Sequence, residues 1–160
     1  MRRRVVLTSL VLLAVSVASR GGESELSPWV EKAFVILKST SSYEEALSFV
    51  KSAAARLNVE VDLRELSADG RLGLTFPRGT CEEEWGEFPC YFPRGRWDDG
   101  VYLSIEYSSG YKGFTSGLYI VVMANGSKES EEARAALVRA KAVYPDAYMK
   151  TTLVYLGCMH

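Results

Sequence analysis

The sequence predicts a domain of the α+β class, in which two strand–helix–strand units share one antiparallel sheet. Helical and strand-like hydrophobic periods alternate along the chain, and the segment FVILKSTSSYEEA aligns with YIVVMANGSKESEEA, which has two extra residues. Duplication of such a unit gives the ferredoxin-like order βαββαβ, a four-stranded antiparallel sheet with two helices on one face. The alternative is that the halves share only what any two strand–helix units have in common.

The first unit is predicted from local periodicity. Residues 33–38 form a short apolar run that is typical of a buried strand. Ser42 and Glu45 have the spacing of a capping box, and residues 43–57 then carry an apolar stripe with helical spacing. Residues 59–63 alternate apolar and charged side chains, which predicts a half-buried strand.

The second unit repeats this pattern. A strand is expected over residues 118–123, a turn at residues 125–127, a helix over residues 131–144 and a last strand over residues 147–156. The residues between the two units, about 67–116, are expected to be an insertion. It contains two strand-like stretches, near residues 72–76 and 101–107, which either pair with one another or extend the main sheet.

The composition limits the size and the chemistry of the protein. With 160 residues, 48% of them hydrophobic and 24% charged, the chain suits one ordinary globular domain. Its formal charge of −1 provides no overall positive field, so nucleic acid is not expected as a partner. The only His is the last residue and there are three Cys, so neither a metal site nor a cofactor is expected.

The first 18 residues have the pattern of a secretory signal peptide. Three arginines precede the apolar run VVLTSLVLLAVSVA, which ends in small residues suited to cleavage. The run has 14 residues, fewer than the ~20 that a helix needs to cross a bilayer. Stable membrane insertion is therefore not expected after cleavage, and an uncleaved anchor is the alternative. Residues 19–32 follow as a linker, and the protein is expected in the periplasm, in the cell envelope or secreted.

Export makes a disulfide plausible inside the insertion. Cys81 and Cys90 enclose the short segment CEEEWGEFPC, and a bridge between them would staple a β insertion that has little regular structure. Cys158 is then left over. It is free, pairs with another chain, or replaces one of the other two cysteines.

Two blocks of the sequence resemble a known family. The segment LYIVVMANGSKESEEARAALVRAKAVYPDAYMKTTLVYLG, and more weakly residues 33–65, are similar to the SPOR (sporulation-related repeat) domain. The resemblance implies one SPOR-like domain over residues 33–157, the βαββαβ fold, and binding to peptidoglycan glycan strands or a similar cell-envelope polysaccharide. The chain departs from the family pattern in its long insertion and in the absence of a Gly-Ser-Phe-like turn after the first strand.

The insertion holds most of the aromatic residues and provides candidate ligands for a glycan. Aromatic faces suit sugar C–H groups, and planar polar groups suit sugar hydroxyls. The candidates are Trp85, Arg94, Arg96, Trp97 and Tyr102. The alternative is that these aromatic side chains form the core of the insertion.

A second candidate surface is the face of the sheet away from the helices. Alternation along the strands places Tyr119 with Val121 on one face, and the repeat alignment adds Phe34 and Ile36. Lys38 falls on the same face, which is expected to point away from the helices because it carries a charge. The alternative is that the insertion folds back and covers this face.

The expected function is non-catalytic binding, with no catalytic residue assigned. A protein-interaction or adhesion module that uses the aromatic insertion is the second hypothesis, and a small cell-wall hydrolase is the third. A glycosidase needs two carboxylates at a defined separation, and the acidic residues here have no diagnostic spacing: Glu82, Glu83, Glu84, Asp98, Asp99 and Glu106.

Overall fold

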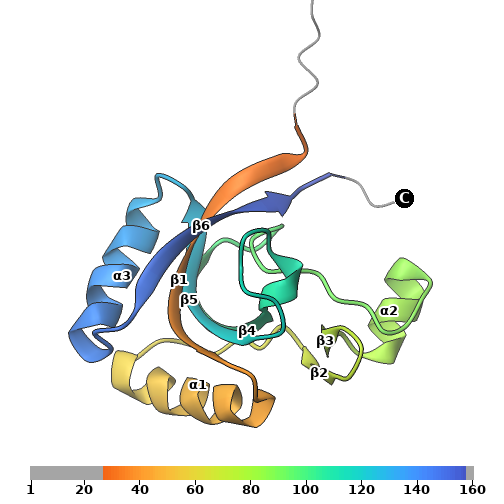
Figure 1. Cartoon of the computed structure of the whole chain (residues 1–160), viewed down its shortest axis with the longest axis horizontal. Helices are drawn as coiled ribbons and strands as arrows, with labels where there is room; N and C mark the ends of the chain where they lie inside the picture. The colour runs from red at the N-terminus through yellow and green to blue at the C-terminus, as the bar shows by residue number, and fades with distance from the viewer. Residues whose placement is uncertain (1–26, 158–160) are drawn as a thin grey trace, which may run out of the picture.

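The computed structural model describes residues 27–157, which fold around a four-stranded sheet (Figure 1). The spatial order of its strands is β4-β5-β1-β6, and every neighbouring pair is antiparallel. This confirms the α+β class and the four-stranded antiparallel sheet. The strands are β1 (Trp29–Thr40), β4 (Gly100–Tyr107), β5 (Tyr119–Ser127) and β6 (Tyr148–Tyr155).

Two long helices cover one face of this sheet, and smaller elements lie between α1 and β4 in the chain. The long helices are α1 (Tyr43–Leu57) and α3 (Glu131–Val143). The short strands β2 (Ser67–Asp69) and β3 (Gly73–Thr75) pair with each other, and helix α2 (Arg78–Trp85) follows them. A 3-10 turn, η1 (Ser108–Gly110), follows β4.

Both long helices begin where a serine caps them. The Ser42 side chain accepts a hydrogen bond from the amide of Glu45 at 3.2 Å, and Ser130 caps α3 in the same way. Such caps satisfy amides that have no partner within the helix. Helix α1 ends at Asn58, whose φ of 48° is left-handed. The helices predicted over residues 43–57 and 131–144 are therefore confirmed, the second to within one residue.

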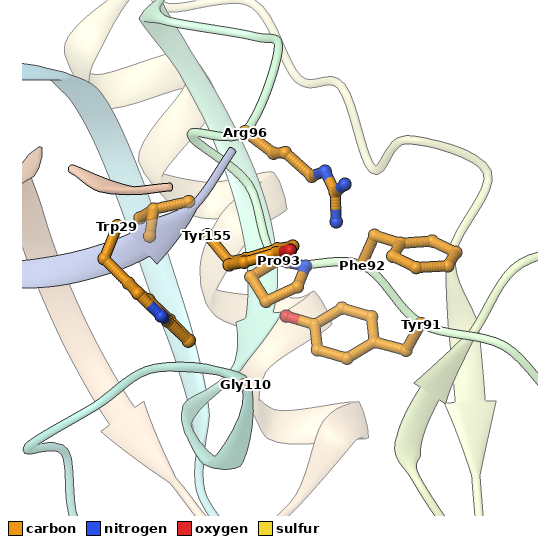
Figure 2. A pocket seen from close by; sticks show the side chains of 8 residues that line it. Trp29, Tyr91, Phe92, Pro93, Arg96, Gly110 and Tyr155 are labelled. Atoms are coloured by element: carbon orange, nitrogen blue, oxygen red, sulfur yellow. The ribbon is translucent and has the colours of Figure 1, made fainter. Parts of the chain in front are cut away.

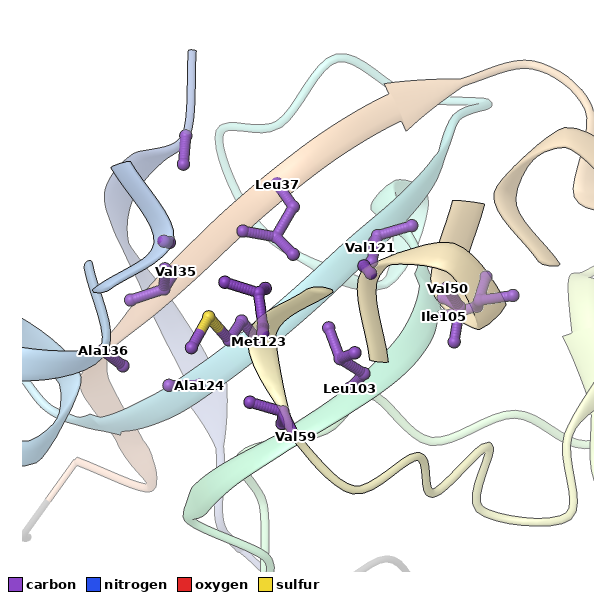
Figure 3. Close-up of a cluster of buried hydrophobic side chains, with 14 of the residues drawn as sticks. Val35, Leu37, Val50, Val59, Leu103, Ile105, Val121, Met123, Ala124 and Ala136 are labelled. Atoms are coloured by element: carbon purple, nitrogen blue, oxygen red, sulfur yellow. The ribbon is translucent and has the colours of Figure 1, made fainter. Parts of the chain in front are cut away.

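The sheet has a hydrophobic core on each face because β1 is buried on both sides. Val35 and Leu37 contribute to the core between the sheet and the long helices, together with Val50 of α1 (Figure 3). Phe34 and Ile36 point to the opposite face and pack in a separate cluster. A strand buried on both faces explains why residues 33–37 are continuously apolar.

The strand predicted over residues 59–63 is not part of the sheet. The segment makes only one bridge, from Val61 to Leu103 of β4, and the chain turns at Arg64 and Glu65, which both have positive φ. β4 lies beside β5 instead because it buries side chains on both faces, with Leu103 toward the helices and Glu106 on the other side. The expected insertion therefore supplies one of the four strands.

Two boundaries also differ from expectation. The residues from Trp29 to Lys32, expected in a linker, already pair with β6, so β1 starts earlier. Residues 125–127, expected as a turn, are the end of β5, because the Asn125 side chain is buried and hydrogen-bonded. The expected signal peptide, residues 1–18, and Cys158 lie outside the described residues. Within residues 27–157, no helix has the length and apolar character that crossing a membrane requires.

Candidate functional site

The face of the sheet away from the long helices is covered by residues 91–98 and 108–116, which flank β4 in the chain and together form the covering segment. Phe34 and Ile36 lie on this face, as predicted, but both are completely buried. The Tyr111 ring packs edge-on against Phe34, with ring centres 5.0 Å apart. Gly95 adds to the cover, since a Cβ atom there would lie 2.8 Å from the Phe34 ring. This face therefore does not reach solvent at these residues, so the alternative of a covering segment is correct.

Tyr119 and Val121 lie on the other face, against the helices, so the predicted grouping with Phe34 and Ile36 is wrong. Val121 belongs to the core under the helices, and Tyr119 packs against it. The physical reason is an irregular register, because Ile36 pairs with Val122 whereas Lys38 pairs with Val121. A repeat alignment assumes regular strands, and a bulge shifts every later side chain to the other face.

Lys38 also lies on the helix side, although a charge was expected to point away from it. Its Nζ is 2.7 Å from a carboxylate oxygen of Glu45 and 5.5 Å from the centre of the Phe49 ring, both on α1. A lysine near the end of a strand keeps its charge paired while its stem covers apolar surface.

Arg94 holds the covering segment to the sheet, and Tyr102 of β4 is one of its partners. Arg94 is completely buried, and its guanidinium donates to the Asn125 side chain, the Ser104 hydroxyl and the carbonyls of Tyr102 and Gly100. The Tyr102 ring lies 3.3 Å from the guanidinium carbon. Burial lowers the pKa of Arg94. Every nitrogen of this guanidinium already has a partner in the protein, so Arg94 does not serve a ligand.

A second buried network surrounds Glu106. Its carboxylate accepts two hydrogen bonds from Arg64 Nη1, at 3.0 and 3.1 Å, and further bonds from the hydroxyls of Tyr91 and Tyr111 and the amide of Arg94. Burial, and then the charge of Glu106, raises the pKa of both tyrosines, so they stay protonated and donate. The network joins the segments around residues 64, 91 and 111 to the C-terminal end of β4.

The predicted disulfide between Cys81 and Cys90 is confirmed, with a sulfur–sulfur distance of 2.05 Å. Both cysteines pack with Phe92 in a small core of their own, against which the Trp85 ring also packs. Trp85 is the last residue of α2, and its ring centre lies 4.1 Å from that of Phe92. The bridge therefore fixes the helix that carries Trp85.

Trp97 is the most exposed of the predicted aromatic site residues. Its ring is stacked on that of Trp85, with centres 6.1 Å apart and planes 17° apart, and the residue is 64% exposed. The guanidinium carbon of Arg96 lies 4.4 Å from the centre of the Trp97 ring. Trp85, Trp97 and Arg96 are thus brought together as the sequence predicted, whereas Arg94 and Tyr102 lie in the buried network.

Two clefts meet at these residues, and Phe92 lines both. The first, which we call the tryptophan cleft, has a volume of about 460 Å³ and contains Trp85 and Trp97. Its charged side chains are Asp62, Arg64, Glu65 and Glu84. The second, the Arg96 cleft, has a volume of about 400 Å³ (Figure 2). It is lined by Arg96, Phe92, Pro93, Tyr91, Trp29 and Tyr155, among others.

Trp29 and Tyr155 belong to this site but were missed from the sequence. Trp29 was placed in the linker, and Tyr155 in the last strand with no assigned role. The two are directly opposite in the antiparallel pair β1–β6, and their ring centres are 5.1 Å apart. Pairing the first strand with the last, as a ferredoxin-like order requires, could have brought them together.

Most of the candidate acidic residues are held in ion pairs, and two of them, Asp98 and Glu106, share Arg64. Glu106 is held by Arg64, Asp98 by Arg64 and the Tyr102 hydroxyl, and Asp99 by Lys32. Glu84 lines the tryptophan cleft, and the Glu82 carboxylate pairs with Arg78.

Comparison with known proteins gave no match to a protein-family model, a curated protein or a solved structure.

Proposed function

We propose that this protein is an exported, non-catalytic module that binds a saccharide strand. The glycan of bacterial peptidoglycan is the first choice of ligand, and other cell-envelope polysaccharides form the wider class. The observation that carries the proposal is the stacked pair of Trp85 and Trp97, which has an exposed ring beside carboxylates and a guanidinium. Rigid aromatic faces suit the C–H side of a sugar ring, and the charged groups suit its hydroxyls.

The disulfide supports export, because such bonds persist outside the reducing cytoplasm. It also supports binding, because it fixes the position of Trp85 before a ligand arrives. A preorganised site loses less conformational entropy on binding than a mobile one.

We also propose a ferredoxin-like arrangement and a distant relation to SPOR domains. The order β4-β5-β1-β6 supports the first, with α1 between β1 and β4 in the chain and α3 between β5 and β6. In this protein the ligand lies along the outer side of the covering segment, because the helix-free sheet face is buried. The site therefore differs from the open sheet face that strand alternation predicted.

We expect Trp97→Ala to weaken retention of the exported protein on amidase-treated peptidoglycan by about tenfold or more, as for aromatic residues at the centre of a binding site. Tyr148→Ala is the matched control, because Tyr148 is also an exposed aromatic residue but lies at the opposite end of β6 from Tyr155. An equal loss of retention in Trp97→Ala and Tyr148→Ala would count against the tryptophan cleft as the binding site. A reducing-end assay on the same samples should show no bond cleavage.

Tyr119→Ala is expected to lower the stability of the fold and leave peptidoglycan binding unchanged. The Tyr119 ring packs between Tyr43 and Tyr107, and its hydroxyl donates to the Gly73 carbonyl at 3.1 Å. Its removal should lower the free energy of unfolding by about 2–3 kcal/mol, less than for a fully buried ring. Retention on peptidoglycan below the melting temperature should stay unchanged. A binding defect in folded Tyr119→Ala would place the ligand nearer to the helix side.

A protein-binding or adhesion role is the second candidate. It is favoured by exposed apolar side chains at one end of the β1–β6 pair: Trp29, Val30, Leu153 and Leu156. Failure of the wild-type protein to bind peptidoglycan above a non-binding control protein would reject the first candidate and favour this one.

A further inference from the structure

Arg96 is a buried cation with an unused donor. The residue is only 9% exposed, and its Nη2 donates to the Gly157 carbonyl. Its Nε has no hydrogen-bond partner among the described residues, and none of the ion pairs found between them includes Arg96. A buried donor without an acceptor costs free energy, and the cost is larger on a charged group. Nε itself is closed to solvent, so a carboxylate in the cleft would pair with the guanidinium as a whole, which has no carboxylate partner among the described residues.

The cleft around Arg96 is apolar and carries no negative charge among its described lining residues. Figure 2 shows the guanidinium extending toward Phe92, with Pro93 and Tyr155 on its other side. A second cation, Lys112, does not line the cleft, but its Nζ lies 3.5 Å from the centre of the ring of Trp29, which does. Positive charge beside aromatic walls suits an organic anion with an apolar body.

The tryptophan cleft has the opposite character. Asp62, Glu65 and Glu84 line it, and its single cation, Arg64, is already paired with Glu106 and Asp98. A carboxylate would be repelled there, whereas a neutral sugar ring would not. The two clefts are adjacent, since Arg96 lies against the Trp97 ring. One strand can therefore present different groups to each cleft.

We propose that the Arg96 cleft binds the carboxylate of an acidic sugar, while a neighbouring neutral sugar stacks in the tryptophan cleft. The inference rests on the proposed saccharide function and adds a charge requirement for the ligand. A carboxylate oxygen pairs with the guanidinium of Arg96, and the body of the sugar packs against the aromatic walls. Charge-assisted hydrogen bonds of this kind are about twice as strong as neutral ones.

The test compares two forms of one ligand on the wild-type protein. The first probe is peptide-free peptidoglycan glycan, in which the muramic acid residues carry a lactyl carboxylate. The second is the same material after carbodiimide coupling to methylamine, which converts each carboxylate to a neutral amide. We expect the wild-type protein to bind the acidic strands at least about tenfold more tightly, with a preference that falls as salt rises.

Arg96→Gln should bind both probes with the affinity that the wild-type protein has for the amide, and Arg96→Lys should keep only part of the preference. Arg78→Gln is the matched control, because Arg78 is an exposed arginine of α2 that pairs with Glu82, and it should keep the full preference. Trp97→Ala should weaken the binding of both probes equally.

The outcomes separate the two proposals. Equal wild-type affinity for both probes would overturn this inference and leave the saccharide function standing, as would a full preference in both Arg96 variants. No binding of either probe would overturn the saccharide function and this inference with it. The comparison of the two probes on the wild-type protein can overturn the inference by itself, even if Arg96→Gln folds poorly.

Discussion

Glu106→Gln is expected to lower the free energy of unfolding by about 3–5 kcal/mol, the usual cost of breaking a buried ion pair by removing one partner. The Glu106 carboxylate is completely buried and accepts hydrogen bonds from Arg64, Tyr91 and Tyr111. Glutamine keeps the shape but loses the charge, and its amide NH₂ group faces donors instead of acceptors. Domains of this size have a free energy of unfolding of only about 5–15 kcal/mol, so the variant would lose a large part of its total stability.

Urea unfolding followed by far-ultraviolet circular dichroism measures this loss. Glu82→Gln is the matched control, because the Glu82 carboxylate pairs with Arg78 on the exposed side of α2. Surface changes of that kind alter stability by less than about 0.5 kcal/mol. If Glu106→Gln is as stable as Glu82→Gln, the Glu106 network does not hold the covering segment to the sheet.

Reduction of the Cys81–Cys90 bridge is expected to cost about 2.5 kcal/mol from loop closure alone, and to abolish the binding that depends on Trp85. The bridge joins residues nine positions apart, and Cys81 lies within α2, a helix of eight residues with no side-chain cap. So short a helix is not stable alone in water. Once it is released, the stacking of Trp85 on Trp97 should be lost, while α1, α3 and the sheet stay folded.

Near-ultraviolet circular dichroism, which reports on the tryptophan environment, should change much more than the far-ultraviolet signal when a phosphine reductant is added. The double variant Cys81→Ser/Cys90→Ser is the control. It should resemble the reduced protein, and the reductant should have no further effect on it, which separates this bridge from any effect at Cys158. Unchanged peptidoglycan retention after complete reduction would show that the disulfide is not needed to position Trp85 for binding.

The helices could be predicted because their signals are local. Ser42 with Glu45, and Ser130 with the Glu-Glu-Ala start, define helix beginnings within a few residues. The disulfide was equally local, since two cysteines around a short polar segment had few other partners. Local patterns could not decide which segment forms the edge strand beside β5, because the segment 59–63 and β4 both have strand-like alternation.

The candidate site could be predicted only in part. Trp85, Arg96 and Trp97 come close enough in the chain to suggest one surface, and they do lie together. Phe34 and Ile36 were assigned to the correct face, but their burial depends on Tyr111, which is 77 residues beyond Phe34 in the chain. Trp29 was missed because its partner, Tyr155, lies at the far end of the sequence.

Local sequence patterns were enough to predict the α+β class, the two long helices, the disulfide and the presence of an aromatic, arginine-containing segment. Which charged residues are buried follows from the tertiary fold. Arg94 and Glu106 would be surface residues by type, yet each is completely buried because distant segments supply its hydrogen-bond partners. Arg96 is the contrasting case, since burial left its Nε unpaired at a cleft. The satisfaction of a buried charge depends on contacts between segments far apart in the chain, which no local pattern encodes.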